Sequence, residues 1–397
     1  MSILKVGAIR GVSASEDAIT VASDGTATGN FTNRKGKNLV INGGMTVSQR
    51  ATTTGSVTTG ATIDVCDRWK RNVDLPSGVS NLTMSKETDS PDGFSTSLKV
   101  TPNQARDASL SGADRFFISQ IIEAQNIRTS GWSYNDPNSK LTLSFYIKSN
   151  LTGVVSIEVK SNDSPTSTSH FRGTATINSA NTWERKTLVI PGHADLVFNN
   201  DNGDGLSFTF MYAAGPSFTS GTHVTGQWTD TTSGERASSS NIDIFSSASN
   251  FVSLTGVQLE LGGKATDFEH EPYCDTVRKC LRYYYASRVD GTLGVGTNNY
   301  GSGFFGFGLN GNIIGGGGRF PEPMRGIPTM TLIEPQDATV NNVHLFRGVT
   351  GSNSGVDVSG TGVNFVDVGV YGYMYIQFTS TTQGGGYLYH IIADSEI

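Results

Sequence analysis

The chain has 397 residues, of which 48 are glycine, and only 16% of its residues are charged. With 29 basic and 35 acidic residues and no basic run, it lacks the electrostatic surface of a nucleic-acid binder. No apolar stretch approaches the ~18 residues that span a bilayer, and the first residues show no signal region. We therefore expect synthesis in a cytoplasm, no membrane insertion, and no nucleic-acid partner. Many glycines and few charges are typical of short strands joined by tight turns.

Residues 1–37 contain two short strand-like runs. One starts at Leu4, and the other, Ile19 to Val21, is followed by Asp24-Gly25. An Asp-Gly pair next to alternating apolar residues predicts a β-hairpin. Because 37 residues cannot bury a core of their own, this segment is expected to pair with other chains or with a partner in a larger particle.

Residues 38–268 alternate between apolar and polar side chains in several runs, which is the period of half-buried strands. Turn-rich loops separate the runs, and no helical pattern lies between them. This pattern predicts a β-sandwich or a jelly roll. The side chains expected to point inward are Leu143, Phe145, Ile157, Phe208 and Phe210.

Residues 269–286 break the pattern with apolar residues at helical spacing, and Pro272 suits the first turn of a helix. We expect one helix here, whose aromatic stripe packs into the core. From 287 to 397 the chain returns to glycine-rich β character. The run 371–378 is apolar on both strand faces, so it must be covered on two sides, and a neighbouring chain is expected to supply one cover.

The search for catalytic motifs is negative. The histidines form no H-E-x-x-H pattern, and no G-x-S-x-G elbow is present. A single G-x-G-x-x-G, which starts at Gly306, is not followed by a helical pattern, so we interpret it as a strand and turn. The sequence therefore predicts neither hydrolase nor transferase activity.

One loop has partial metal-ligand spacing. Asn200, Asn202 and Asp204 alternate ahead of Gly205, as oxygen ligands do in a calcium loop. However, Met211 stands where the bidentate glutamate belongs. An ordinary Asn/Gly turn explains the loop equally well, so calcium is a weak candidate, and no other cofactor is expected.

Aromatic residues in polar surroundings are the remaining candidates for ligand binding. Trp132, Tyr134 and Trp228 lie in loop-like segments, and flat rings there can stack on the apolar faces of sugars. The alternative is that each ring closes an end of the sandwich.

Several motifs resemble those of tail fibre and tail appendage proteins of tailed bacteriophages. The segment NLVINGGMTVSQRAT, followed by CDRWKR, is similar to the opening of a recurrent tail module. A second segment, VQLELGGKATDFEHEPYCDTVRKCLRYYY, is similar to the end of the same module. The resemblance therefore covers residues 38–285. The short start and the final ADSEI are similar to the two ends of such fibres. Ser48 departs from the pattern, since an aromatic residue often precedes the Gln-Arg pair.

The resemblance implies a virion tail protein with a carbohydrate-binding-like jelly roll, usually homotrimeric. It implies attachment to other tail proteins through residues 1–37 and binding to a glycan of the host surface. The resemblance supplies no catalytic residues. It implies a structural role, stabilising the fold, for the Asp67-Arg68-Trp69 and Glu269-His270 motifs. Two alternatives remain, a tailspike that depolymerises glycan and a carbohydrate-binding or adhesive protein of cellular origin. The absence of a 20–50-residue repeat argues against the first, and the missing signal peptide against the second.

Overall fold

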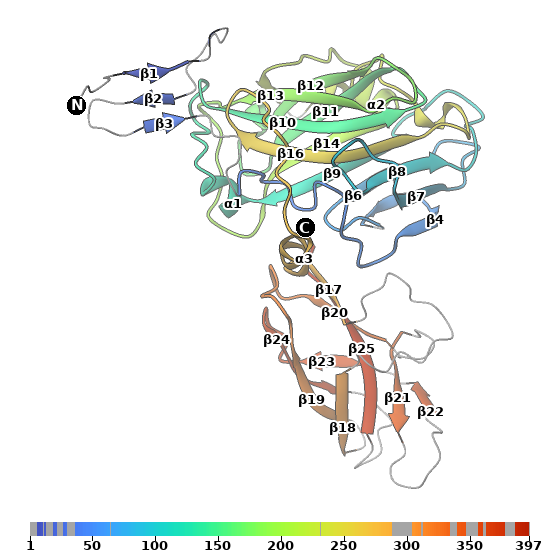
Figure 1. Ribbon diagram of the computed structural model, residues 1–397. Helices are drawn as coiled ribbons and strands as arrows, with labels where there is room; N and C mark the ends of the chain where they lie inside the picture. The colour runs from blue at the N-terminus through green and yellow to red at the C-terminus, as the bar shows by residue number, and fades with distance from the viewer. Residues whose placement is uncertain are drawn as a thin grey trace.

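The computed structural model shows an elongated molecule of three parts: a small N-terminal sheet, a two-sheet sandwich, and a C-terminal β domain, with helix α3 between the last two (Figure 1). The structure describes residues 6–10, 12, 19–21, 27–29, 36–63, 65–230, 232–287, 304–310, 313–333, 340–346, 356–359, 363–377 and 386–396. Within these residues, no helix is long and apolar enough to cross a membrane.

The sandwich consists of two antiparallel sheets, which confirms the predicted mainly β, jelly-roll class. In spatial order, the six-stranded sheet contains β13 (Glu184–Pro191), β10 (Lys140–Ser149), β16 (Val252–Leu261), β8 (Ser97–Pro102), β7 (Leu82–Glu87) and β4 (Thr53–Val57). The seven-stranded sheet contains β15 (Trp228–Thr229), β12 (His170–Ile177), β11 (Gly153–Ser161), β14 (Asp204–Ala214), β9 (Arg115–Glu123), β6 (Lys70–Asp74) and β5 (Gly60–Thr62).

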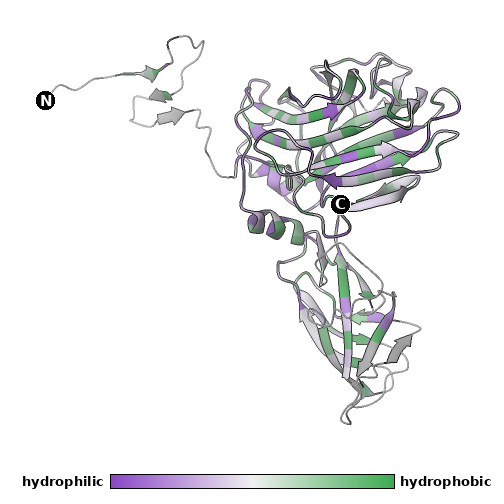
Figure 2. Ribbon diagram, turned by 45° about the vertical axis from the view of Figure 1, so that its right-hand side comes forward, coloured by the Kyte–Doolittle hydropathy of each residue, from purple (hydrophilic) through white to green (hydrophobic). Residues whose placement is uncertain are grey.

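The core lies between the two sheets. All five side chains predicted to point inward, from Leu143 to Phe210, are fully buried, so the predicted register is confirmed. Phe145 of the six-stranded sheet contacts Phe210 of the other sheet edge-on, at 4.7 Å between ring centroids. Figure 2 shows hydrophobic residues alternating with hydrophilic ones along these strands.

The outer face of the six-stranded sheet is also partly covered, which the alternating pattern does not predict. Thr142 and Ser144 of β10 point outward yet are buried, and the Thr142 hydroxyl donates to the Gly262 carbonyl at 2.7 Å. Small hydroxyl side chains let the loop after β16 lie close to the sheet. The chain that follows this loop, residues 268–276, lines the candidate site together with residues 38–46 and the loop between β7 and β8.

Two short α-helices and three 3-10 turns lie in the connections of the sandwich, where no helix was predicted. They are α1 (Ala124–Arg128), α2 (Pro216–Thr219), Thr166–Thr168, Ser233–Glu235 and Ile244–Ser246.

The predicted helix is present but shorter than 269–286. Helix α3 (Tyr273–Leu281) starts directly after Pro272, and β17 (Tyr284–Ala286) then pairs with β25 (Gly386–Asp394) of the C-terminal domain. Tyr284 is therefore a strand residue, and Tyr273 is 63% exposed rather than packed in a core. The helical spacing was correct only up to Leu281, because pairing with β25 overrides it beyond that point.

The C-terminal domain is a single antiparallel sheet in the described residues. Its strands in order are β22 (Val356–Ser359), β21 (Asn342–Phe346), β25 (Gly386–Asp394), β18 (Phe304–Asn310), β19 (Ile313–Arg319), β24 (Gly372–Gln377) and β23 (Asn364–Val366), with β17 and β20 (Thr329–Ile333) also paired to β25. Tyr373 and Ile376 of β24 are buried, whereas Met374 between them is 63% exposed. Because side chains alternate along a strand, Tyr373 and Ile376 lie on opposite faces of β24, so this chain covers part of each face and leaves Met374 exposed.

The N-terminal strands β1 (Ala8–Ile9), β2 (Ile19–Val21) and β3 (Ala27–Gly29) form a separate antiparallel sheet. Pairing of β2 with β3 confirms the predicted hairpin, and its Asp24-Gly25 turn lies outside the described residues.

Candidate functional site

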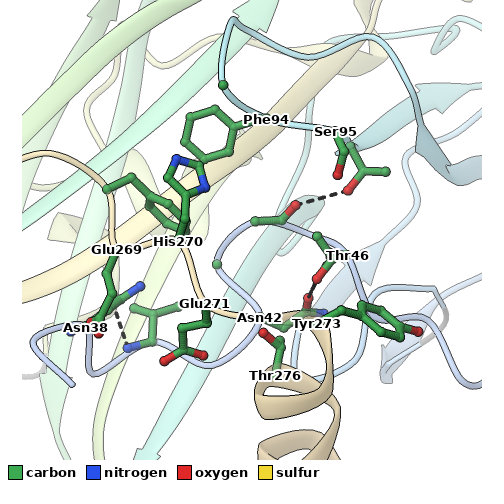
Figure 3. A pocket seen from close by; sticks show the side chains of 16 residues that line it. Asn38, Asn42, Thr46, Phe94, Ser95, Glu269, His270, Glu271, Tyr273 and Thr276 are labelled. Carbon is green, nitrogen blue, oxygen red and sulfur yellow. Dashed lines mark hydrogen bonds between the residues drawn. The ribbon is translucent and has the colours of Figure 1, made fainter. Parts of the chain in front are cut away.

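An open-sided pocket of about 690 Å³ lies beside the end of β16, where three chain segments meet: 38–46, 93–96 and 268–276 (Figure 3). The first segment extends the sheet, because the Val257 amide donates to the Gly43 carbonyl at 3.0 Å. Gly43 is required there, since a Cβ atom would lie 2.0 Å from the Val257 carbonyl oxygen. The volume is within the range of small-molecule sites, roughly 300–1,000 Å³.

One wall of the pocket is aromatic. Phe94, Phe268 and His270 contact one another pairwise, with ring centroids 4.9 to 5.1 Å apart. Phe94 also lies 5.3 Å from the ring of Tyr146 on β10. Gly256 permits this arrangement, because its φ is +60° and a Cβ atom would lie 2.7 Å from the Phe94 ring. Phe94 and Phe268 are half-buried, and His270 is exposed at the rim.

The polar groups of the pocket divide into those that hold the fold and those that are open to a ligand. The Glu269 carboxylate accepts hydrogen bonds from the backbone amides of Gly36 and, at 2.8 Å, Asn38. By contrast, no hydrogen bond among the described residues engages the His270 ring nitrogens or the Tyr273 hydroxyl. Glu269 therefore has the structural role that the resemblance implies, while His270 and Tyr273 are available at the rim.

The three aromatic residues predicted to bind glycan lie elsewhere. Trp132 and Trp228 are 3% and 7% exposed, and their indole nitrogens donate to the carbonyls of Ser139 and Pro191 at 3.4 and 2.7 Å. Tyr134 is half-buried and packs edge-on against Phe198 at 5.0 Å. The burial of both indoles favours the alternative that they close the core. Glycan binding by these three residues stays a prediction.

The structure brings Trp132 and Tyr134 together and links them indirectly to Trp228. Their ring centroids are 6.2 Å apart, and the Tyr134 carbonyl accepts a hydrogen bond from the His193 amide, two residues after Pro191. The three residues thus lie around the end of β13, away from the pocket.

The three residues predicted to bind calcium each have a different environment. Asn200 is exposed, the Asn202 side chain donates to the Arg325 carbonyl, and Asp204 is half-buried at the start of β14. Burial raises the pKa of the Asp204 carboxyl above its ordinary value. In the part of the chain that the structure describes, no group of three or more His, Cys, Asp or Glu side chains is arranged to hold a metal. The calcium site stays a prediction.

Sequence reasoning missed the pocket because its residues come from segments far apart in the chain. His270 was assigned to the fold with Glu269, and Tyr273 to a buried helical stripe. A usable signal was present: Tyr273 directly follows Pro272 in the first turn of the helix, where a side chain can point away from the core.

Comparison with known proteins gives weak likenesses. No protein-family profile and no curated protein matches the chain. The enzymatically active domain of tailspike protein 4 of bacteriophage CBA120 shares 13% identity over 57% of this chain and 22% of that chain, with a TM-score of 0.29. A putative sugar-binding protein of Bacteroides thetaiotaomicron shares 13% identity over 57% of this chain and 100% of that chain, with a TM-score of 0.30. A family 11 carbohydrate-binding module of Clostridium thermocellum shares 15% identity over 51% of this chain and 91% of that chain, with a TM-score of 0.25. At these scores the likenesses carry no argument about the ligand.

Proposed function

We propose that this chain is a structural protein of a bacteriophage tail, a fibre or appendage that binds a glycan of the host surface in the pocket beside β16. The observation that carries the glycan proposal is the aromatic wall of Phe94, Phe268 and His270 next to unpartnered polar groups. The assignment to a phage tail depends on the motif resemblance of residues 38–285.

The pocket suits a sugar for a physical reason. A pyranose has an apolar face, which packs on aromatic rings, and hydroxyls around its edge, which need hydrogen-bond partners when they leave water. Phe94 and Phe268 supply the rings. The nitrogens of His270 and the hydroxyl of Tyr273 supply donors and acceptors at the rim.

The pocket contains two carboxylates, and both have assigned partners. Glu269 accepts backbone amides, and Glu271 is ion-paired with Lys279 of α3. A glycosidase needs a carboxyl pair that faces the scissile bond. We therefore propose binding without cleavage, with a depolymerising tailspike as the alternative.

We further propose a homotrimer that attaches to other tail proteins through residues 1–37. The support is the exposed apolar surface of the C-terminal sheet, where Phe305, Phe307, Leu309 and Met374 are each more than half exposed. Large exposed apolar side chains on one sheet mark an interaction surface, and closed symmetry limits its growth.

The test measures binding of the purified full chain to lipopolysaccharide and capsule from a panel of bacterial strains. We expect a retained glycan without release of reducing sugar. The double variant His270→Ala/Tyr273→Ala should lose at least about tenfold in affinity, equivalent to ~1.4 kcal/mol. Tyr371→Ala is the matched control, because Tyr371 is 68% exposed in the C-terminal domain.

Each outcome decides a separate point. Equal affinity of the double variant and wild type would remove the pocket from the proposal. Release of reducing sugar would favour the depolymerising alternative. Retention by the wild type and the Tyr371 variant, with loss in the double variant, supports the proposed function.

A further inference from the structure

Trp183 differs from the other three tryptophans of the chain. Trp69, Trp132 and Trp228 are at most 7% exposed, whereas Trp183 is only half-buried. It directly precedes the edge strand β13. A large ring kept at the surface of a sheet edge is available for contact with a ligand.

Strand register places Trp183 on the same face as the pocket. Arg185 of β13 lies opposite Tyr146 of β10, whose ring contacts Phe94. Because side chains alternate along a strand, Trp183 points to the outer face together with Arg185. Trp183 therefore lies roughly 7 Å from Tyr146 along the strand direction and about 5 Å from it across the sheet.

A carboxylate is fixed beside the Trp183 ring. Asp89 Oδ1 accepts a hydrogen bond from the indole Nε1 at 3.2 Å, and the two Asp89 oxygens lie 2.9 and 3.2 Å from the Lys148 ammonium nitrogen. The Asp89 side chain is 50% exposed, while that of Lys148 is 19% exposed. The hydrogen bond from Lys148 lowers the pKa of Asp89, so the carboxylate is an anion at neutral pH.

The cations around this group already have partners. Lys148 is ion-paired with Asp89, and Arg185 donates to the Thr266 carbonyl. The Asp89 carboxylate is therefore a half-exposed anion beside the ring that can accept hydrogen bonds. Such a group suits the hydroxyls of a neutral sugar and disfavours a carboxylate-bearing one, because two like charges repel.

We propose that Trp183 and Asp89 form a second sugar position for a neutral pyranose, and that one glycan chain runs to it from the pocket across Tyr146. The proposal deepens the proposed function and rests on it. The loop between β7 and β8 joins the two positions, because it carries both Asp89 and Phe94. A ligand that reaches both positions needs more than one sugar unit.

The test compares disaccharide and hexasaccharide fragments of the bound lipopolysaccharide or capsule, in neutral and uronic-acid forms of the same length. Trp183→Ala should lower affinity for the neutral hexasaccharide about tenfold and leave the disaccharide unchanged. Trp183→Phe keeps a ring and should lose less. Asp89→Asn should raise affinity for the uronic-acid hexasaccharide relative to wild type. Val189→Ala is the control, since Val189 is exposed on the same face of β13.

The results separate this proposal from the one on which it rests. If the wild type binds no fragment, the proposed function fails. If the double variant at His270 and Tyr273 loses binding but the Trp183 and Asp89 variants match wild type on every fragment, only the second position is overturned. Thermal unfolding of each variant shows whether it is folded, and the Phe and Asn substitutions serve if the alanine variant is not.

Discussion

The guanidinium carbon of Arg68 lies 3.5 Å from the centre of the Tyr283 ring, and that of Arg50 lies 3.6 Å from the next ring, Tyr284. Each arginine comes from the start of the sandwich, and the two tyrosines follow helix α3. Cation–π contacts of this kind are strongest when the charge is desolvated, as for Arg68, whose side chain is 2% exposed.

Residues near the C-terminus also take part in this contact between the sandwich and the C-terminal domain. Glu396 is ion-paired with Arg68 and lies 3.5 Å from Arg50, while the Ser395 amide donates to the Tyr283 carbonyl at 2.8 Å. Arg325 of the C-terminal domain donates to the Ser395 and Asn202 carbonyls at 2.7 and 2.9 Å. Four motifs of the sequence therefore meet at this contact: Gln49-Arg50, Asp67-Arg68-Trp69, Arg282-Tyr283-Tyr284 and Asp394-Ser395-Glu396.

Glu396→Ala should destabilise the protein by about 3 kcal/mol, because it leaves the buried Arg68 charge without its carboxylate. Calorimetry would record this loss as a lower unfolding temperature. Asp92→Ala, at an exposed position, should change stability by no more than about 0.5 kcal/mol. Equal effects of the two variants would show that the ion pair contributes nothing.

Phe145→Ala should cost about 3–5 kcal/mol, because the fully buried ring leaves a cavity between the two sheets. Urea unfolding followed by tryptophan fluorescence measures the loss. Val189→Ala on the neighbouring strand is the control, since its side chain is 39% exposed. A loss below 1 kcal/mol for Phe145→Ala would contradict the assigned core.

The Glu158 carboxylate should make stability depend on pH. Burial alone raises its pKa, but the hydrogen bond from His170 and the charge of Arg236 outweigh burial and lower the pKa to about 2. A carboxyl whose pKa is depressed on folding stabilises the protein above its ordinary pKa of 4.5, and this contribution falls as pH drops from about 5 towards 2. Glu158→Gln should therefore cost about 3 kcal/mol at pH 7.

The pH series provides the control for that substitution. The stability difference between wild type and Glu158→Gln, measured in urea, should shrink steadily below pH 5, because the carboxyl of the unfolded wild-type chain takes up a proton while the folded one does not. A difference that stays constant from pH 7 to pH 3 would contradict the assigned pKa direction.

The fold could be predicted from the sequence wherever one strand face alone is buried. Period-two alternation identified Phe145 and Phe208 as core residues, because a shift of one residue would expose the whole set. Alternation could not identify the buried outer-face hydroxyls of Thr142 and Ser144, since the loop that covers them comes from a distant segment. Helical spacing likewise ran past Leu281, because sequence alone does not show the partner strand β25.

The candidate site was less predictable for a related reason. Trp132 and Trp228 stand in polar sequence surroundings, yet both are buried, because each indole nitrogen finds a backbone carbonyl inside the fold. Phe94 and His270 are separated by 176 positions in the numbering of the chain (270 minus 94), and only the folded structure brings their rings to 5.1 Å. The residues Glu269-His270 were noted as a motif, but the different roles of the two side chains follow only from their hydrogen bonds.

The apolar surface of the C-terminal sheet should hold a homotrimer together. On β18, Phe305, Phe307 and Leu309 all point outward and are 51–58% exposed. Phe307 pairs with Gly315 and Gly386 on the neighbouring strands, so no side chains from its paired partners shield it. Sedimentation in dilute buffer should give about three times the 42.2 kDa of one chain.

Phe307→Ser should shift the sedimenting species towards the single chain, because it removes an apolar contact from each copy of the interface. Val189→Ser, which changes an exposed apolar residue on the sandwich, should leave the mass unchanged. Deleting residues 1–37 should preserve the C-terminal contacts while abolishing the attachment to a phage tail that we propose for this segment. A wild-type species of the mass of one chain would refute oligomerisation, and twice that mass would refute the trimer alone.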